Sequence, residues 1–196
     1  MLDSRTVSVV PFHGMLPEGM RRVGLVTHAD PRGALTEILR DSWGLGPHAV
    51  QWNMVRSRPG TLRGVHVHPK HTDYWILVNG QATVGYRDLR DGSPTAGMAG
   101  ELRLSGEIPE MLVIPPGVAH GFQFEAWSVH LYGVTSYWNM ADELGCKWDD
   151  PELGISWPWP GPPVLSPRDA EAKPLRDLLR ELVPHQATLV APPPGP

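Results

Sequence analysis

The chain has 196 residues, 41% of them hydrophobic, and a formal net charge of −4 without any dense run of Lys and Arg. This length suits one domain with a full core, and the charge argues against nucleic acid as a partner. The single cysteine, Cys146, excludes an internal disulfide framework and fits a reducing compartment. No stretch approaches the roughly 18 apolar residues of a membrane span, and the first residues lack the order of a signal peptide. We therefore expect a soluble cytoplasmic protein.

Short runs of alternating polarity, separated by frequent Pro and Gly, dominate most of the chain. This pattern predicts many short strands and turns, spaced as in a sandwich or barrel. The predicted strands fall, in chain order, at residues 50–55, 64–68, 74–78, 81–88, 111–114, 120–124 and 127–134.

One helix is predicted near the end of the chain, at about residues 173–183. Pro174 suits its first turn, and four leucines follow at i, i+3, i+4 and i+7, namely Leu175, Leu178, Leu179 and Leu182. Residues 185–196 contain the sequence APPPGP and are predicted to be disordered. We expect a single domain over 1–184, with N-terminal strands in 1–45. Periodicity alone leaves residues 34–40 (ALTEILR) open between helix and strand.

Three histidines and one carboxylate are predicted to converge in the barrel. His66 and His68 are two residues apart, so on a strand they point to the same face. Asp73 follows shortly afterwards, and His120 lies in a second segment, PPGVAHGF. Such a group can hold a divalent metal or move protons.

These residues resemble the two signature motifs of the cupin superfamily. The first motif is matched by Gly60, His66, His68, Asp73 and Gly80, and the second by Pro115, Gly117 and His120. Within the cupins, the chain resembles dTDP-4-dehydrorhamnose 3,5-epimerases in collinear segments that include DPRGALTE, QWNMVRS, GTLRGVH, RDGSPTAG, IPPGVAHGF, KWDDPELGISWP and VLSPRDAEAKPL. The resemblance implies an all-β jelly-roll barrel (double-stranded β-helix), a homodimer, and a strand for residues 34–40.

The resemblance also implies an isomerase that epimerises C3, C5 or both carbons of a dTDP-4-keto-6-deoxyhexose. It assigns His66 as the base, Asp150 as the partner that orients His66, and Tyr132 as the acid. Histidine suits this chemistry because its pKa lies near neutrality, and a carboxylate on the other ring nitrogen fixes the tautomer. The positions matching the nucleotide and pyrophosphate contacts are Arg32, Glu37, Gln51, Asn53 and Arg63.

Two departures from the family pattern point to a metal. His68 stands where the family usually has an amide, and Asp73 replaces the lysine that stabilises the enolate oxygen. An aspartate repels that anion, whereas a divalent metal (Fe, Mn, Ni, Co or Zn) bound by His66, His68, Asp73 and His120 polarises a carbonyl. In that arrangement His66 cannot act as the base, and Tyr132 or His130, on the same strand face, becomes the proton carrier and a substrate contact. No organic cofactor is expected.

Two other functions are compatible with the same residues. Two histidines and a carboxylate with open positions suit a metal-dependent cupin dioxygenase, lyase or cyclase of natural-product biosynthesis. Loss of the lysine also suits a non-catalytic protein that only binds sugar nucleotides.

Overall fold

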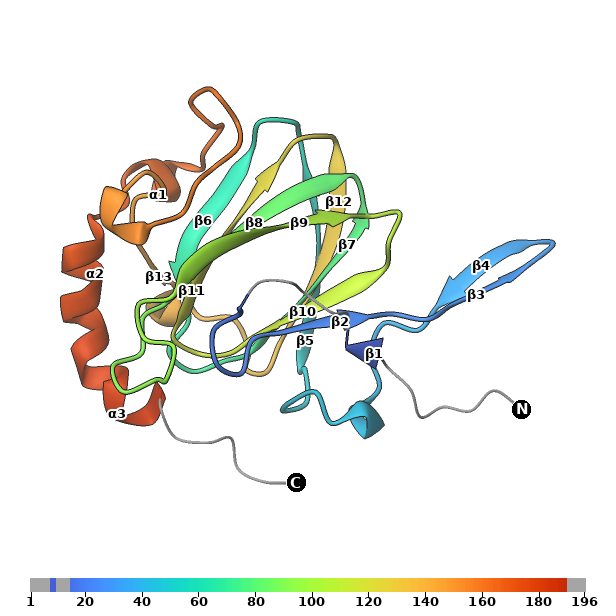
Figure 1. The fold of residues 1–196 in the computed structure, drawn as a ribbon, viewed down its shortest axis with the longest axis horizontal. Coiled ribbons are helices and arrows are strands. Elements are labelled where there is room, and N and C mark those ends of the chain that lie inside the picture. Colours follow the sequence, from blue (N-terminus) through green and yellow to red (C-terminus); the bar gives the residue numbers. More distant parts are fainter. Residues whose placement is uncertain (1–7, 10–14, 190–196) are drawn as a thin grey trace.

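The computed structural model describes residues 8–9 and 15–189, and its strands form two facing antiparallel sheets (Figure 1). One sheet runs in the order β1 (Ser8–Val9), β2 (Arg21–Gly24), β10 (Glu110–Ile114), β7 (Asp73–Asn79), β12 (Ser128–Val134) and β5 (Gln51–Ser57). The other runs β13 (Leu144–Gly145), β6 (Leu62–Val67), β11 (Val118–Phe124), β8 (Gln81–Asp88) and β9 (Ala99–Ser105). From β5 to β8 and from β9 to β13, consecutive strands alternate between the two sheets, which confirms the predicted jelly-roll.

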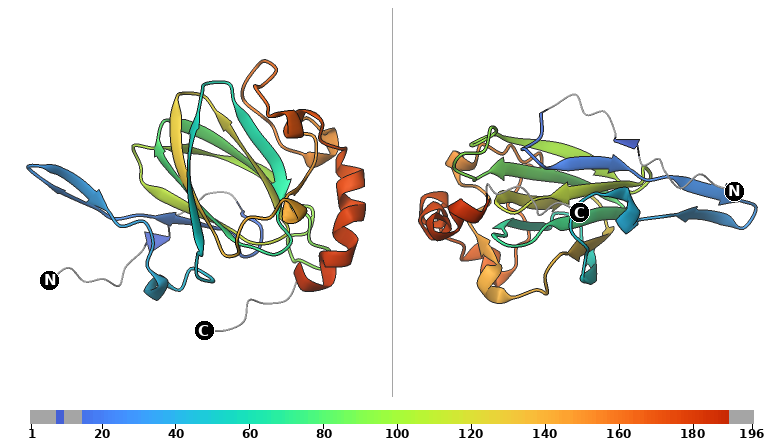
Figure 2. Two further views of the ribbon diagram at one scale, coloured as in Figure 1. Left: turned by 180° about the vertical axis from the view of Figure 1, so that it is seen from behind. Right: turned by 90° about the horizontal axis from the view of Figure 1, so that it is seen from below.

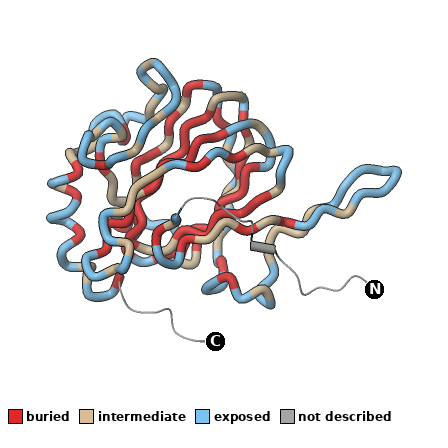
Figure 3. Tube along the Cα trace, in the orientation of Figure 1, coloured by how far each residue is buried: buried red, intermediate tan, exposed pale blue. Residues whose placement is uncertain are grey.

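The main core lies between the two sheets. Its large members come from both, with Trp75 on β7 stacked on Phe122 of β11 at a centroid distance of 4.4 Å. Every residue of β11 is buried, because its second face is covered as well. Figure 3 shows this burial running through the barrel strands. The strands therefore hold any side chain that points inward in a fixed position.

The predicted C-terminal helix is confirmed as α2 (Leu175–Leu182), which lies outside the five-stranded sheet (Figure 1). Leu175, Leu178 and Leu182 are buried against Val65 and Val67 of β6. A short helix, α1 (Pro167–Ala170), precedes it; after it come η4 (Val183–His185) and α3 (Gln186–Leu189). The predicted disordered segment thus begins with a helix, and residues 190–196 lie outside the described part of the chain. None of the described helices is both long and apolar enough to cross a membrane.

A two-stranded hairpin, β3 (Thr27–Asp30) and β4 (Gly33–Thr36), projects from the body of the molecule (Figure 2). It is mostly exposed, and the side chain of Leu35, which pairs with His28, is among the exposed apolar ones at 61%. The segment 34–40 is therefore strand only as far as Thr36, and is followed by the 3-10 turn η1 (Asp41–Trp43). Of the predicted N-terminal strand region, residues 1–7 and 10–14 lie outside the described residues.

Strands β6 and β11 approach each other closely beside the site. Gly64 has φ +127°, and a Cβ there would lie 2.7 Å from the Cα of Gly121 and 2.9 Å from the His120 carbonyl oxygen. Only glycine fits this approach. Two residues further along β6, His66 is the direct partner of His120 on β11. The contact thus sets two functional side chains opposite each other.

Candidate functional site

A pocket of about 610 Å³ opens between the two sheets. This volume is in the range of small-molecule sites. Most of the titratable side chains predicted from the sequence line it, namely Arg63, His66, His68, Asp73, His120, His130 and Tyr132.

The imidazole of His66 on β6 is paired with Asp169 of α1. Its Nε2 lies 2.7 Å from Asp169 Oδ1, and both side chains are largely buried. A carboxylate only accepts and a guanidinium only donates, so the contact with Asp169 assigns the ring hydrogen to Nε2, and Arg168 Nη2, which also lies near Nε2, donates no hydrogen bond to it in this tautomer. Nδ1 is then the nitrogen that can accept a proton. Burial on its own would raise the pKa of Asp169. The pKa is nevertheless lowered to about 2, because His66 contributes a hydrogen bond and a charge and Arg168 contributes a second charge. Asp169 is therefore a permanent anion that stabilises a protonated His66.

The fold around Asp169 explains its position. Ser166 caps α1, its hydroxyl oxygen accepting from the Asp169 amide at 3.1 Å, and Pro167 begins the helix. The amide of Gly64 donates to Asp169 Oδ2 at 3.4 Å. Arg168 is more exposed, with Nη2 2.6 Å from His66 Nε2 and an ion pair to Glu143 at 3.2 Å.

Asp150, predicted to orient His66, lies elsewhere. It caps the 3-10 turn η3 (Pro151–Leu153), and Oδ1 accepts from the Glu152 amide at 2.9 Å. Its Oδ2 accepts from the Leu175 amide at 2.8 Å, which ties the turn to the start of α2. The prediction was wrong because an aspartate directly before proline is a favoured helix cap. The sequence signal for Asp169 was its place in the collinear segment VLSPRDAEAKPL, where Ser166 and Pro167 mark a helix start.

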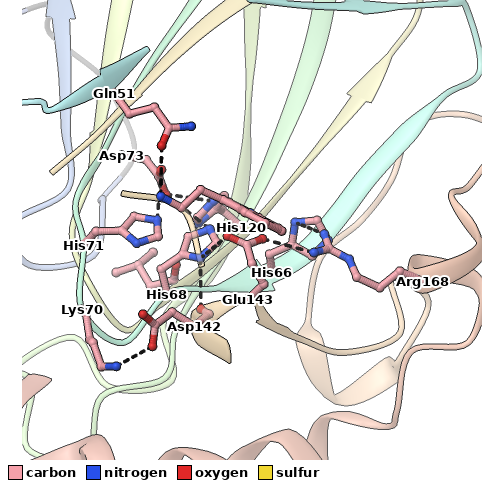
Figure 4. A network of polar contacts seen from close by, with 12 residues as sticks. Gln51, His66, His68, Lys70, His71, Asp73, His120, Asp142, Glu143 and Arg168 are labelled. Carbon is pink, nitrogen blue, oxygen red and sulfur yellow. Dashed lines mark hydrogen bonds and ion pairs between the residues drawn. The ribbon is translucent and has the colours of Figure 1, made fainter. Parts of the chain in front are cut away.

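His68, Asp73 and His120 form a separate buried group, with one ligand atom from each within 4.8 Å of the others (Figure 4). Asp73 Oδ2 lies 3.5 Å from Nε2 of both His68 and His120. His66 is not part of this group, so the structure reduces the predicted four-residue metal set to three. Burial lowers the pKa of His68 well below its usual value and that of His120 to about 4, and raises the pKa of Asp73 well above its usual value.

Two further residues that sequence analysis missed surround this group. His71 Nε2 lies 3.6 Å from Asp73 Oδ1, and Glu143 Oε1 lies 3.5 Å from His68 Nδ1. His71 belongs to the same HVHPKHTD segment and was a visible signal. Glu143 lies between the 3-10 turn η2 (Met140–Asp142) and β13, far from that segment in sequence.

Tyr132 and His130, both on β12, line the same pocket. Tyr132 is half-buried, and burial raises the pKa of its phenol. His130 stacks on Phe124 at a centroid distance of 5.2 Å, and burial lowers the pKa of its imidazole to about 3. Its Nδ1 is buried without a hydrogen-bond partner among the described residues. A neutral His130 therefore offers a bound molecule a polar contact rather than a charge.

The predicted nucleotide contacts are divided between the pocket and the surface. Arg63 lines the pocket and donates to Ser57 Oγ at 3.0 Å. Gln51 and Asn53 bond to each other on β5, at 3.1 Å, outside the pocket lining. At the tip of the projecting hairpin Arg32 is 89% exposed and pairs with Asp30, while Glu37 pairs with Arg40. One protomer thus does not bring these residues together.

Comparison with known proteins agrees with this architecture. The sequence model of dTDP-4-dehydrorhamnose 3,5-epimerase matches residues 18–177. The spore coat polysaccharide biosynthesis protein SpsL of Bacillus subtilis is 34% identical over 144 residues, which cover 71% of this chain and 95% of SpsL.

Two solved structures are similar in fold. NovW, a 4-keto-6-deoxy sugar epimerase of Streptomyces spheroides, has a TM-score of 0.81 and 29% identity, with 96% of this chain and 98% of NovW covered. The 3,5-epimerase RmlC of Legionella pneumophila, in complex with dTDP-4-keto-L-rhamnose, has a TM-score of 0.75 and 32% identity, with 81% and 89% covered. The chain belongs to the dTDP-4-dehydrorhamnose 3,5-epimerase family.

Proposed function

We propose that the protein epimerises a dTDP-4-keto-6-deoxyhexose at C3, C5 or both, by removing a proton beside the ketone. The observation that carries this proposal is the His66–Asp169 pair on the wall of a pocket that Tyr132 also lines. The family supports it, as does the Legionella relative, whose structure contains dTDP-4-keto-L-rhamnose. The same family assignment does not support an oxygenase, lyase or cyclase.

His66 Nδ1 takes the C–H proton, and Asp169 stabilises the imidazolium that forms. The electron pair of the C–H bond moves into an enolate at the neighbouring carbonyl. Tyr132 then returns a proton to the opposite face of the carbon; a phenol is protonated at neutral pH, and burial, which raises the pKa of Tyr132, favours that form further. The enolate oxygen needs positive charge or hydrogen-bond donors nearby during this step.

The diphosphate of the substrate is bound by Arg63, whose guanidinium fork matches phosphate oxygens. Arg32 and Glu37 serve the same ligand only if they come from a second protomer. We propose a homodimer in which the projecting hairpin contacts the partner. The edge strand β5 supports this, since its apolar side chains Trp52 and Met54 are exposed.

Light scattering after size exclusion tests the dimer. We expect about twice the 21.6 kDa chain mass for the protein, and a shift towards monomer for Met54→Glu. Val183→Glu is the matched control, because Val183 is also exposed but lies beside the C-terminal helix. A monomeric wild-type protein at micromolar concentration contradicts the dimer.

Two further attributes follow the proposed function. The convergence of His68, Asp73 and His120 supports a divalent transition metal among Fe, Mn, Ni, Co and Zn, bound by three residues of this chain. The nucleotide-sugar substrate and a single buried thiol, Cys146, support a cytoplasmic location.

Incubation with dTDP-4-keto-6-deoxyglucose in deuterated water tests the function. We expect deuterium at C3, C5 or both, because every cycle of abstraction and return exchanges the carbon-bound proton with solvent. Mass spectrometry and NMR of the recovered sugar locate the label. Binding of dTDP without exchange indicates a non-catalytic sugar-nucleotide-binding protein, and oxygen consumption indicates an oxygenase; either result overturns the proposal.

A further inference from the structure

The buried group of His68, Asp73 and His120 presents three acceptor atoms to one point. The Nδ1 of His120 lies 3.0 Å from the Val118 carbonyl oxygen, and the Nδ1 of His68 lies 3.5 Å from the Asp142 carbonyl oxygen. A carbonyl only accepts, so each Nδ1 carries the hydrogen and each Nε2 presents a lone pair. Both lone pairs face Asp73 Oδ2. Three converging lone pairs in a buried site repel one another unless a proton or a metal cation lies between them.

The spacing of these atoms matches a metal centre. For metal–ligand distances of about 2.0–2.2 Å at tetrahedral angles, neighbouring ligand atoms are about 3.3–3.6 Å apart. The two distances between Asp73 Oδ2 and the histidine Nε2 atoms are both 3.5 Å, within this range. Backbone carbonyls hold both rings from the other nitrogen, as outer contacts commonly do in metal sites.

We propose that His68, Asp73 and His120 bind one divalent transition metal, while His66 stays outside the coordination shell as the base. The separation of the two centres is visible in Figure 4, where His66 turns towards Arg168 and the other three converge. His66 and His120 are strand partners, so both centres face the same pocket. His66 therefore remains free to accept a proton while a metal is bound. In a four-residue site its nitrogen would bind the metal and could not accept one.

A second grouping, formed by His68, His71 and Glu143, is disfavoured. Glu143 lies near Nδ1 of His68, the nitrogen that also faces the Asp142 carbonyl. That nitrogen carries a hydrogen and cannot bind a metal. Glu143 is therefore an outer partner that helps orient His68.

The role of the metal rests on the proposed function, but its binding does not. An ionised Asp73 on its own opposes the negative charge of an enolate, and a dication beside it reverses the sign of the local field. Three protein ligands leave at least one position open towards the pocket. A bound dication supplies Lewis-acid stabilisation for the substrate oxygen.

The test is a Co(II) titration of the full chain after dialysis against EDTA, followed by visible absorption. We expect d–d bands that saturate at one Co(II) per chain. Asp73→Asn and His120→Asn should each weaken binding by about 100-fold or more, since loss of even an outer partner costs about 10–100-fold. His66→Asn and the exposed His48→Asn are matched controls that should retain wild-type affinity. Circular dichroism confirms that each variant is folded.

X-ray absorption at the cobalt edge of the wild-type protein gives a readout independent of any variant. Two imidazole ligands are expected. Three imidazoles, loss of binding in His66→Asn, or absence of saturable binding overturns the proposal. If the protein binds no metal but exchanges deuterium into the substrate, the metal proposal is wrong and the epimerase proposal holds. If the protein binds the metal but exchanges no deuterium, the epimerase proposal is wrong and the metal proposal holds.

Discussion

Replacement of His66 by Asn should lower the rate of substrate deuteration by about 10³-fold, because general-base catalysis contributes about 10²–10⁴-fold. Asparagine keeps a polar group of similar size at the position but has no proton-accepting nitrogen. The side chain lines the pocket and is not part of the apolar core, so the barrel should remain folded. Single-turnover deuteration and dTDP affinity, measured together, separate loss of the base from loss of binding.

His48→Asn is the matched control for this substitution. His48 is exposed and pairs with Asp41 away from the pocket, so its replacement should leave the rate unchanged. If His66→Asn retains more than about a tenth of the wild-type rate, another group removes the proton. His130, stacked on Phe124 in the same pocket, is the next group to replace in that case.

Asp169→Asn should lower kcat by about 10²–10⁴-fold with little change in KM, whereas Asp150→Asn should leave kcat nearly unchanged. The two substitutions are chemically identical, and their sites differ only in what each carboxylate contacts. Asp169 accepts from the ring of His66, and asparagine there leaves the wrong tautomer and no charge for the imidazolium. Asp150 contacts only backbone amides, and asparagine there keeps one of its two hydrogen bonds, so the substitution costs stability of about 1 kcal/mol but removes no group from the pocket. Steady-state kinetics with thermal unfolding as a stability check decide between them.

The pH dependence of stability gives Asp169 a second signature. Its pKa is depressed to about 2 in the folded protein, below the usual value of about 3.9 for an unfolded chain. The carboxylate therefore contributes stability that is fully present above about pH 4 and is lost as the pH falls through about 2. Asp169→Asn should flatten this part of the acid-unfolding profile, and Asp150→Asn should not. Equal loss of kcat in both variants contradicts the assignment of Asp169.

The sequence was sufficient to predict the fold. Alternating polarity and regular turns predict a sandwich or barrel, and the two facing sheets confirm it. The spacing of His66 and His68 predicts one strand face for both, because strand periodicity fixes which way a side chain points, and both side chains line the pocket. The family resemblance supplied the pairing of both signature segments within one barrel.

What the sequence did not reveal depends on contacts between distant elements. Asp169 reaches His66 across 103 residues because α1 packs against β6, and no periodicity encodes that approach. The family resemblance pointed to Asp150, but its carboxylate accepts hydrogen bonds from the backbone amides of Glu152 and Leu175. Exclusion of His66 from the metal group follows from which nitrogen faces Asp169, a matter of ring orientation. The exposed hairpin carries Arg32 away from its own pocket, and a single chain's sequence says nothing about a second copy.

The close contact between Gly64 and Gly121 couples the positions of His66 and His120, which lie on the two strands that meet there. Any side chain at this point would spread β6 from β11 and move His66 and His120 at once. A substitution that changes the surroundings of one of these imidazoles and spares the other must therefore lie away from this seam. For His66 such positions lie on the helix that bears Asp169, and for the group of His68, Asp73 and His120 they lie in the turn whose Asp142 carbonyl contacts His68.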